Sequence, residues 1–208
     1  MKLASANQTT LYYVHDPMCS WCYAFRPLWQ QILAELPEDI QVEYILGGLS
    51  PDSDQPMPND LQHSLIKTWE RIMTTVPGTT FNFDFWQQQK PRRSTYPACR
   101  AIIAARALDR DRENAMIYGI QDAYYQQAKN PSDTETLIDI AVGLGLDRAA
   151  FSQQLQAPAT QQSLLQELAF ARSIGGDSFP SLILKRPGES HHVLMLSYTD
   201  KTKILSQL

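Results

Sequence analysis

The Cys19-Ser20-Trp21-Cys22 motif, placed between an expected strand and an expected helix, constrains the fold of this chain more than any other feature. The preceding residues 11–15 are aromatic and β-branched, which predicts a short buried strand. After the motif, apolar residues recur at three- and four-residue steps from Phe25 to Leu36, which predicts an amphipathic helix that ends at Pro37. The two cysteines are therefore expected on the first turn of that helix.

The spacing of Cys19 and Cys22 suits reversible disulfide chemistry. Side chains three residues apart on a helical turn are neighbours, and the free N–H groups of a helix start stabilise a thiolate on the first cysteine. We expect Cys19 to attack a substrate disulfide and the more buried Cys22 to resolve the mixed disulfide. Ser20 and Trp21 lie between them and are expected to contact the substrate, with Trp21 offering an apolar face.

The rest of the chain separates into strand-rich ends and a helical middle. Strands are expected at residues 40–46, 181–184 and 191–196, and a last short helix at residues 200–208. Helices are expected near residues 61–76, 97–109, 111–127, 132–142, 147–156 and 159–174. Without the helical block the order is β-α-β-β-β-α, which predicts a discontinuous domain of residues 1–58 plus 175–208 and a helical insertion at residues 59–174.

Composition and charge exclude several classes of protein. Hydrophobic residues make up 43% and charged residues 19% of the 208 residues, which is typical of a globular chain. The net charge is −4 and no basic run exceeds Arg92-Arg93, so a nucleic-acid partner is not expected. No apolar stretch reaches the roughly 20 residues that span a bilayer, and residues 1–8 lack the apolar region of a secretory signal. We therefore expect a cytoplasmic protein without a membrane partner.

A metal site is a weaker explanation of the cysteine pair. A tetrahedral zinc site needs four ligands, usually from a second Cys or His pair. Beyond the motif the chain offers only Cys99, His15, His63, His191 and His192, at irregular spacings. We expect no metal ligands.

Several segments together resemble a known family. Asp16-Pro17-Met18-Cys19-Ser20-Trp21-Cys22, followed by Phe25-Arg26-Pro27, resembles the DsbA-like group that includes FrnE-type and predicted cytoplasmic protein-disulfide isomerases. Gly47-Gly48-Leu49, Pro97-Ala98-Cys99-Arg100-Ala101 and Ser178-Phe179-Pro180 are also similar to that group. The resemblance spans nearly the whole chain. It implies an α/β protein with a thioredoxin fold and an inserted all-helical domain, acting as a thiol–disulfide oxidoreductase of the protein disulfide reductase or isomerase kind.

The resemblance also implies roles for individual residues. Cys19 would be the nucleophile, Cys22 the resolving thiol and Pro180 a cis-proline facing them, with Phe179 and Pro180 presenting backbone to the substrate. Substrates would be protein or peptide disulfides, and no bound cofactor is implied, because glutathione or a thioredoxin system would supply the electrons. The group carries an acidic residue six positions before the nucleophile. Tyr13 stands there in this chain, so proton transfer at Cys22 needs another group or water.

Other residues near the motif have both a functional and a simpler structural explanation. A protonated His15 could stabilise the Cys19 thiolate or could merely end the strand. Cys99 could be a third redox thiol or a small buried hydrophobe. The aromatic residues between 81 and 86 could line a substrate groove, although such density usually fills a core. Arg92-Arg93 could attract a carboxylate of glutathione, although a solvated pair is the simpler explanation.

Two other functions are compatible with parts of the sequence. Kappa-class glutathione transferases and 2-hydroxychromene-2-carboxylate isomerases share the implied fold, but they use a single Ser or Cys where Cys19 stands, so Cys22 counts against them. A non-enzymatic peptide-binding module would use Trp21 and the aromatic segment instead. The sequence leaves the physiological substrate, the reduction potential and the oligomeric state open.

Overall fold

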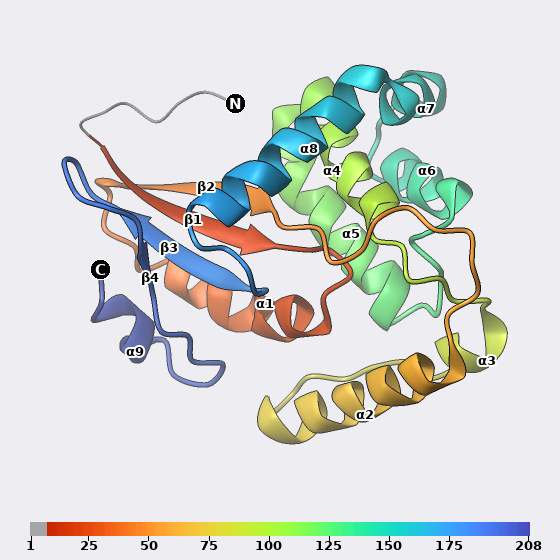
Figure 1. Ribbon diagram of the computed structural model, residues 1–208, viewed down its shortest axis with the longest axis horizontal. Coiled ribbons are helices and arrows are strands. Elements are labelled where there is room, and N and C mark those ends of the chain that lie inside the picture. Colours follow the sequence, from red (N-terminus) through yellow and green to blue (C-terminus); the bar gives the residue numbers. More distant parts are fainter. Residues whose placement is uncertain (1–7) are drawn as a thin grey trace.

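The computed structural model describes residues 8–208, and most of the segment on which the absence of a secretory signal was judged, residues 1–7, lies outside that range. Its centre is a four-stranded sheet with the strand order β2-β1-β3-β4 (Figure 1). Strand β1 (Thr9–His15) runs parallel to β2 (Ile40–Leu46) and antiparallel to β3 (Ser181–Lys185), which pairs with β4 (His192–Val193). The two ends of the sequence therefore meet in one sheet, which confirms the expected α/β class.

Strand β1 has a helical layer on each face because its side chains alternate in direction. Leu11 and Tyr13 belong to the apolar cluster of α1 (Ser20–Leu33), where they pack with Trp29. Tyr12 and Val14 belong to a separate cluster that contains the end of α8 (Pro158–Ser173). A short helix, α9 (Thr202–Leu205), adds Ile204 to the α1 cluster. Helix α1, which begins next to the cysteine motif, therefore packs against one face of the sheet together with α9.

The remaining helices connect β2 to β3 and lie beside the sheet in Figure 1. The aromatic residues that follow α2 surround Trp69, with the Phe81 ring centroid 4.9 Å away, so the core interpretation of that segment is confirmed. None of the helices within residues 8–208 is long and apolar enough to cross a bilayer. The bounds are α2 Asn59–Thr75, α3 Phe85–Gln88, α4 Tyr96–Leu108, a 3₁₀ turn at Arg110–Arg112, α5 Glu113–Tyr125, α6 Thr134–Gly143 and α7 Arg148–Gln156.

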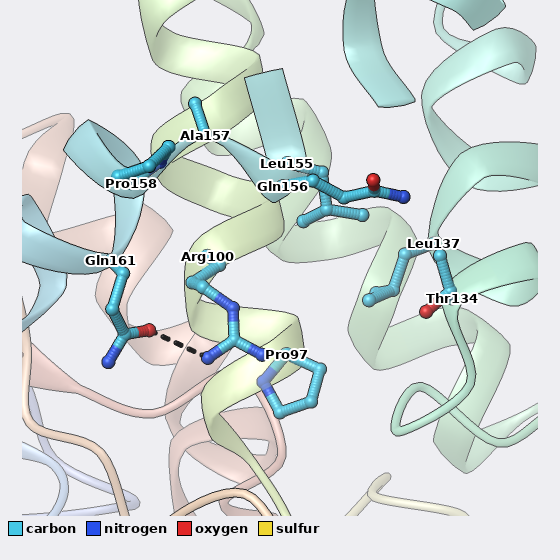
Figure 2. Close-up of a pocket in the computed structure, with 9 residues that line it drawn as sticks. All are labelled: Pro97, Arg100, Thr134, Leu137, Leu155, Gln156, Ala157, Pro158 and Gln161. Carbon is cyan, nitrogen blue, oxygen red and sulfur yellow. Dashed lines mark hydrogen bonds between the residues drawn. The ribbon is translucent and has the colours of Figure 1, made fainter. Parts of the chain in front are cut away.

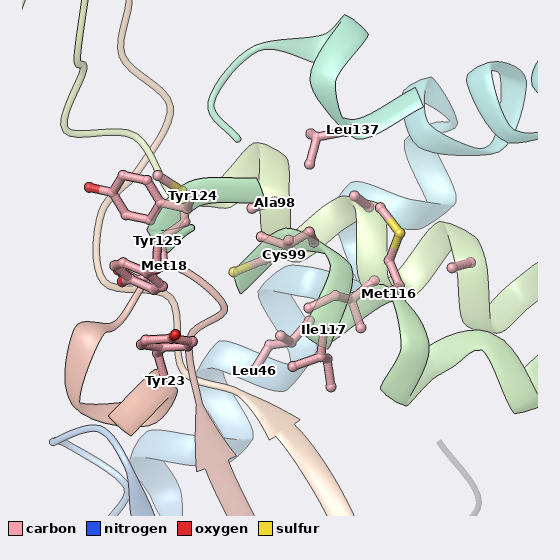
Figure 3. Close-up of a cluster of buried hydrophobic side chains, with 14 of the residues drawn as sticks. Met18, Tyr23, Leu46, Ala98, Cys99, Met116, Ile117, Tyr124, Tyr125 and Leu137 are labelled. Carbon is pink, nitrogen blue, oxygen red and sulfur yellow. The ribbon is translucent and has the colours of Figure 1, made fainter. Parts of the chain in front are cut away.

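One hydrophobic cluster joins these helices to the end of the sheet (Figure 3). Met18, Tyr23 and Leu46 come from the strand-rich part, whereas Cys99 and Tyr125 come from α4 and α5. The C-terminal end of α8, which the predicted boundaries place in the insertion, also packs against the sheet. The division into two domains stays a prediction, and in the structure the two parts share a core.

The structure differs from expectation in two places. The strand expected at residues 191–196 is limited to His192–Val193, because the backbone N–H and C=O of Met195 bond to the side chain of Gln207 instead of to a strand. The segment after α2, where no helix is expected from the sequence, contains the short helix α3.

Candidate active site at the start of α1

The turn between β1 and α1 is held by backbone and side-chain hydrogen bonds before the helix begins. The Cys19 N–H donates to the Asp16 carbonyl at 3.0 Å, and the Met18 N–H donates to Asp16 Oδ1 at 2.8 Å. From α5, the Tyr125 hydroxyl donates to the Met18 carbonyl at 2.7 Å. The turn that presents Cys19 is therefore fixed by the helical part of the chain as well as by its own residues.

Cys19 occupies the N-cap position of α1, immediately before the first helical residue. Its Sγ accepts the N–H of Cys22 at 3.4 Å. An N–H donor and the positive end of the helix dipole both favour negative charge at this sulfur. Cys19 is 7% exposed, so it is buried but, unlike Cys22, not completely closed off from the surface. The geometry suits a thiolate nucleophile.

Cys22 lies one turn further along α1 and is completely buried. Burial, followed by the hydrogen bond and charge of Cys19, raises the pKa of the Cys22 thiol well above its usual value. Cys22 is therefore a protonated thiol that only Cys19 can readily reach. The expectation that Cys22 is the more buried of the two is confirmed.

The segment Phe179–Pro180 lies opposite Cys19. Its peptide bond is cis, as the sequence predicts, and the Cys19 thiol donates to the Phe179 carbonyl at 3.4 Å. The ring of Phe179 rests against the backbone of Gly47 at the end of β2, where a Cβ atom would lie 1.8 Å from Phe179 Cε1. Pro180 is buried, whereas Phe179 is half-buried. Residues distant in sequence thus form one wall of the site.

Trp21 lies on the first turn of α1, two residues after Cys19. Its ring is half-buried and packs against Tyr198, with ring centroids 4.8 Å apart. On α2, the guanidinium carbon of Arg71 lies 5.6 Å from the centroid of the Trp21 ring. Ser20 is only 9% exposed, so it offers little surface to a substrate. An approaching substrate would meet Trp21 and the cationic group beside it.

Asp16, which stands out in the sequence only as part of the family motif, is a residue of this site. The side chain is fully buried, and its Oδ2 accepts from the Leu49 N–H and the Thr95 hydroxyl, both at 2.7 Å. Burial raises the pKa of the Asp16 carboxyl, and these hydrogen bonds oppose the shift. Asp16 therefore ties the turn to the loop after β2 and to the start of α4. Its place beside Pro17 before the motif was the available signal, because Asp accepts hydrogen bonds in turns.

Cys99 lies under the site rather than on its surface. It is fully buried, and its Sγ is 3.7 Å from Asp16 Oδ2. Burial and then the charge of Asp16 raise the pKa of Cys99 well above its usual value. In Figure 3 its sulfur points toward Met18 and the aromatic group. Cys99 is thus next to the motif, as a protonated thiol in a closed core.

His15 and Tyr13 lie behind the motif on β1. His15 is 1% exposed, and neither ring nitrogen has a hydrogen-bond partner among the described residues. Burial, together with the charge of Arg106, lowers the pKa of His15 to about 3. The ring is neutral at physiological pH, so it provides no positive charge for a Cys19 thiolate. Tyr13 stacks on Trp29, and burial raises its pKa well above 10, so it does not replace an acid.

Three cavities in the described part of the chain are lined by residues outside the cysteine motif. One of about 340 Å³ lies between α4, α6 and the junction of α7 with α8 (Figure 2). Its Arg100 is held by Gln161 and by both carboxylate oxygens of Asp52. Arg92, considered for glutathione binding, is engaged by Asp133 and the Ser132 carbonyl.

Comparison with known sequences identifies the family of this chain. Residues 12–207 match a family described as Thioredoxin. A curated relative, the ClpXP adapter protein SpxH of Bacillus subtilis, is 22% identical over 173 residues, which are 83% of this chain and 56% of that protein. The chain thus spans about half the length of the curated relatives it matches.

Solved structures with the same fold cover nearly the whole chain. A candidate protein disulfide isomerase from Nitrosomonas europaea has a TM-score of 0.83 and 23% identity, over 96% of this chain and 95% of that one. The cytosolic disulfide reductase DsbM from Pseudomonas aeruginosa has a TM-score of 0.73 and 26% identity, over 89% of each chain. A second structure of DsbM, with GSH, has a TM-score of 0.70 and 27% identity over the same share of each chain. The extra helices of the present chain therefore belong to a DsbA-like variant of the thioredoxin fold.

Proposed function

Because the chain belongs to the thioredoxin family, we propose that it reduces or isomerises protein disulfides through Cys19 and Cys22. The observation that carries the proposal is the position of Cys19 Sγ, between the Cys22 N–H and the Phe179 carbonyl, each at 3.4 Å. One side of the sulfur faces a helix start that favours a thiolate. The other side faces backbone that an extended peptide can use for hydrogen bonds.

In the first step, Cys19 forms a mixed disulfide with the substrate. The Cys19 thiolate attacks one sulfur of a substrate disulfide, a bond from Cys19 Sγ to that sulfur forms, and the other substrate sulfur leaves as a thiolate. The half-buried Trp21 lies two residues after Cys19, and the Phe179 carbonyl lies 3.4 Å from the attacking sulfur. The substrate is thereby held in an extended conformation across the start of α1.

The second step resolves the mixed disulfide. Cys22 gives its proton to solvent, its thiolate attacks Cys19 Sγ, and the bound substrate sulfur leaves as a thiolate. Cys19 and Cys22 are now oxidised to a disulfide, and the substrate disulfide has been reduced by two electrons. Both substrate thiolates take up protons. Burial, followed by the hydrogen bond and the charge of Cys19, raises the pKa of Cys22, and a mixed disulfide on Cys19 removes the charge but not the burial.

Glutathione is proposed as the reductant that resets the couple. One glutathione thiolate attacks Cys19 Sγ and releases Cys22 as a thiolate, and a second attacks the bound glutathione sulfur to give glutathione disulfide and reduced Cys19. The GSH-bound structure of the 27%-identical DsbM supports this choice over a thioredoxin system. DsbM is described as cytosolic, which supports the expectation of a cytoplasmic protein.

A two-part experiment tests the function. The purified protein is expected to catalyse reduction of insulin disulfides by glutathione, and Cys22→Ser is expected to accumulate a mixed disulfide on Cys19. Cys99→Ser is the matched control, and its fully buried thiol predicts that the adduct still forms on Cys19 when this change is added to Cys22→Ser. Absence of both reduction and adduct would contradict the proposal.

The alternatives predict different results from the same variants. A glutathione transferase or isomerase of the kappa type would keep its activity on a small substrate after Cys22→Ala. A peptide-binding role without redox chemistry, the kind suggested by the adapter name of the SpxH relatives, would survive Cys19→Ala. The burial of Cys22 beside Cys19 favours thiol–disulfide exchange over both.

A further inference from the structure

We propose that Arg71, on α2, recognises a carboxylate of glutathione and makes the site selective for this anionic thiol. The inference rests on the proposed function and assigns part of its specificity to a residue outside the cysteine motif. Arg71 lies beside Trp21, the residue two positions after Cys19. Neither the motif nor the family resemblance pointed to α2.

Arg71 is exposed and free to bind an anion. No ion pair within residues 8–208 involves its guanidinium. Two other arginines are paired, Arg26 with Asp122 at 2.8 Å and Arg100 with Asp52. Arg93 has no ion pair within residues 8–208, but it is half-buried and its charge acts on the buried Asp16 carboxyl. A guanidinium stacked on an indole keeps its edge N–H groups available for a carboxylate.

Arg71 is also the end of a basic stripe. His63, Lys67 and Arg71 follow one another at four-residue intervals on α2, so they lie on one face of the helix. All three are exposed, and their eight-residue separation corresponds to about 12 Å. Asp60 and Glu70 lie three or seven residues from His63 and Lys67, so they share this face and offset part of its charge, whereas Glu70 is about 100° around the helix from Arg71. Arg71 is therefore the positive group at the end of the stripe next to the Trp21 ring.

The dimensions of glutathione match this position. Its cysteine is the central residue, and its glycine carboxylate is one residue from the reacting sulfur, a distance of no more than about 7 Å. Arg71 lies 5.6 Å from the ring of Trp21, two residues after Cys19, so the proposal places the carboxylate of a glutathione bound at Cys19 beside this ring. An uncharged thiol would gain nothing from the guanidinium, so the contact discriminates between thiols by charge.

The test compares glutathione with its diethyl ester, which has the same thiol and no free carboxylate. Reduction of the Cys19–Cys22 disulfide by each thiol is followed in the wild type, Arg71→Ala, Arg71→Lys and Arg148→Ala. Arg148 is an exposed arginine on α7, away from α2 in Figure 1, and controls for the loss of one positive charge. The readout is the ratio of the two rate constants, in which any general effect on folding or on the cysteines cancels.

We expect Arg71→Ala to lower the preference for glutathione over the ester roughly three- to fivefold, the value of one exposed charge-assisted contact. Arg71→Lys should retain most of the preference, Arg148→Ala should retain all of it, and added salt should reduce it in the wild type. An unchanged ratio in Arg71→Ala would overturn the inference and leave the proposed function intact. If Arg71→Ala instead slows only a peptide disulfide flanked by acidic residues, the assignment to glutathione is wrong. Failure of both thiols to reduce the wild-type disulfide would contradict the proposed reductant and Arg71's role together.

Discussion

Replacing Gly47 with alanine should disturb the site through the Phe179 ring. The added Cβ would lie 1.8, 2.3 and 2.6 Å from Phe179 Cε1, Cζ and Cδ1. Unstrained carbon atoms are about 3.5 Å apart, so the ring has to move by about 1.7 Å. Phe179 cannot move far without displacing its own carbonyl, which lies 3.4 Å from Cys19 Sγ. The methyl group therefore affects both the stability and the active site.

Overpacking of this kind costs about 1–3 kcal/mol of unfolding free energy. For a chain of this size, 1 kcal/mol lowers the Tm by roughly 2–4 °C. Urea denaturation of Gly47→Ala measures the cost, and insulin reduction measures the displacement of the Phe179 carbonyl. The matched control is Gly143→Ala, at the end of α6, where an added Cβ meets nothing within 4 Å. That change should be neutral or slightly stabilising, because alanine favours helix over glycine.

A double-mutant cycle shows whether the ring is the cause. In the background of Phe179→Ala the obstacle is absent, so Gly47→Ala should cost much less than in the wild type. An equal cost in both backgrounds, or a cost below about 0.5 kcal/mol in the wild type, would show that the Phe179 ring does not destabilise the Gly47→Ala variant.

Three further predictions concern the buried polar groups around the turn. His15 has a folded-state pKa of about 3 against 6.5 for an unperturbed histidine, so its contribution to stability is present above pH 6.5 and is lost as the pH falls. Between pH 7 and pH 5 this loss of unfolding free energy is about 2 kcal/mol. His15→Phe should remove this pH-dependent loss, and urea denaturation at pH 7 and pH 5 measures it. Asp16→Asn should lower the unfolding free energy by about 1–3 kcal/mol, because an amide cannot accept hydrogen bonds from all of the surrounding donors. Asp54→Asn, at an exposed position, is the control variant. Tyr125→Phe leaves the Met18 carbonyl without its 2.7 Å hydrogen bond and should cost about 1–2 kcal/mol in urea denaturation; no measurable cost would show that another donor replaces the hydroxyl.

The features that the sequence predicted correctly depend on local patterns. The period of apolar residues placed α1 and β2 to within a few residues, and the motif between a strand and a helix pointed to the position of Cys19. The position of Pro180 before a strand, together with the family resemblance, correctly indicated the cis-proline opposite Cys19. These signals lie within one or two neighbouring elements.

The features that the sequence did not predict depend on contacts between distant segments. Asp16 is defined by donors 33 and 79 positions away, Leu49 and Thr95, and no local pattern indicates them. Arg71 meets Trp21 only because α2 packs beside α1. Such pairings follow from tertiary packing, which periodicity and motif spacing do not describe.

The most direct test of the account is the equilibrium titration of the Cys19–Cys22 couple in glutathione redox buffers, with the thiols quantified by alkylation and mass spectrometry. We expect a single two-electron transition that involves Cys19 and Cys22, leaves Cys99 reduced, and has a potential between those of protein disulfide isomerase and thioredoxin, about −180 to −270 mV. A potential near the value of about −120 mV that is typical of a DsbA-type oxidant would contradict the proposed reductase or isomerase role. The absence of any transition between these two cysteines would contradict thiol–disulfide exchange by Cys19 and Cys22.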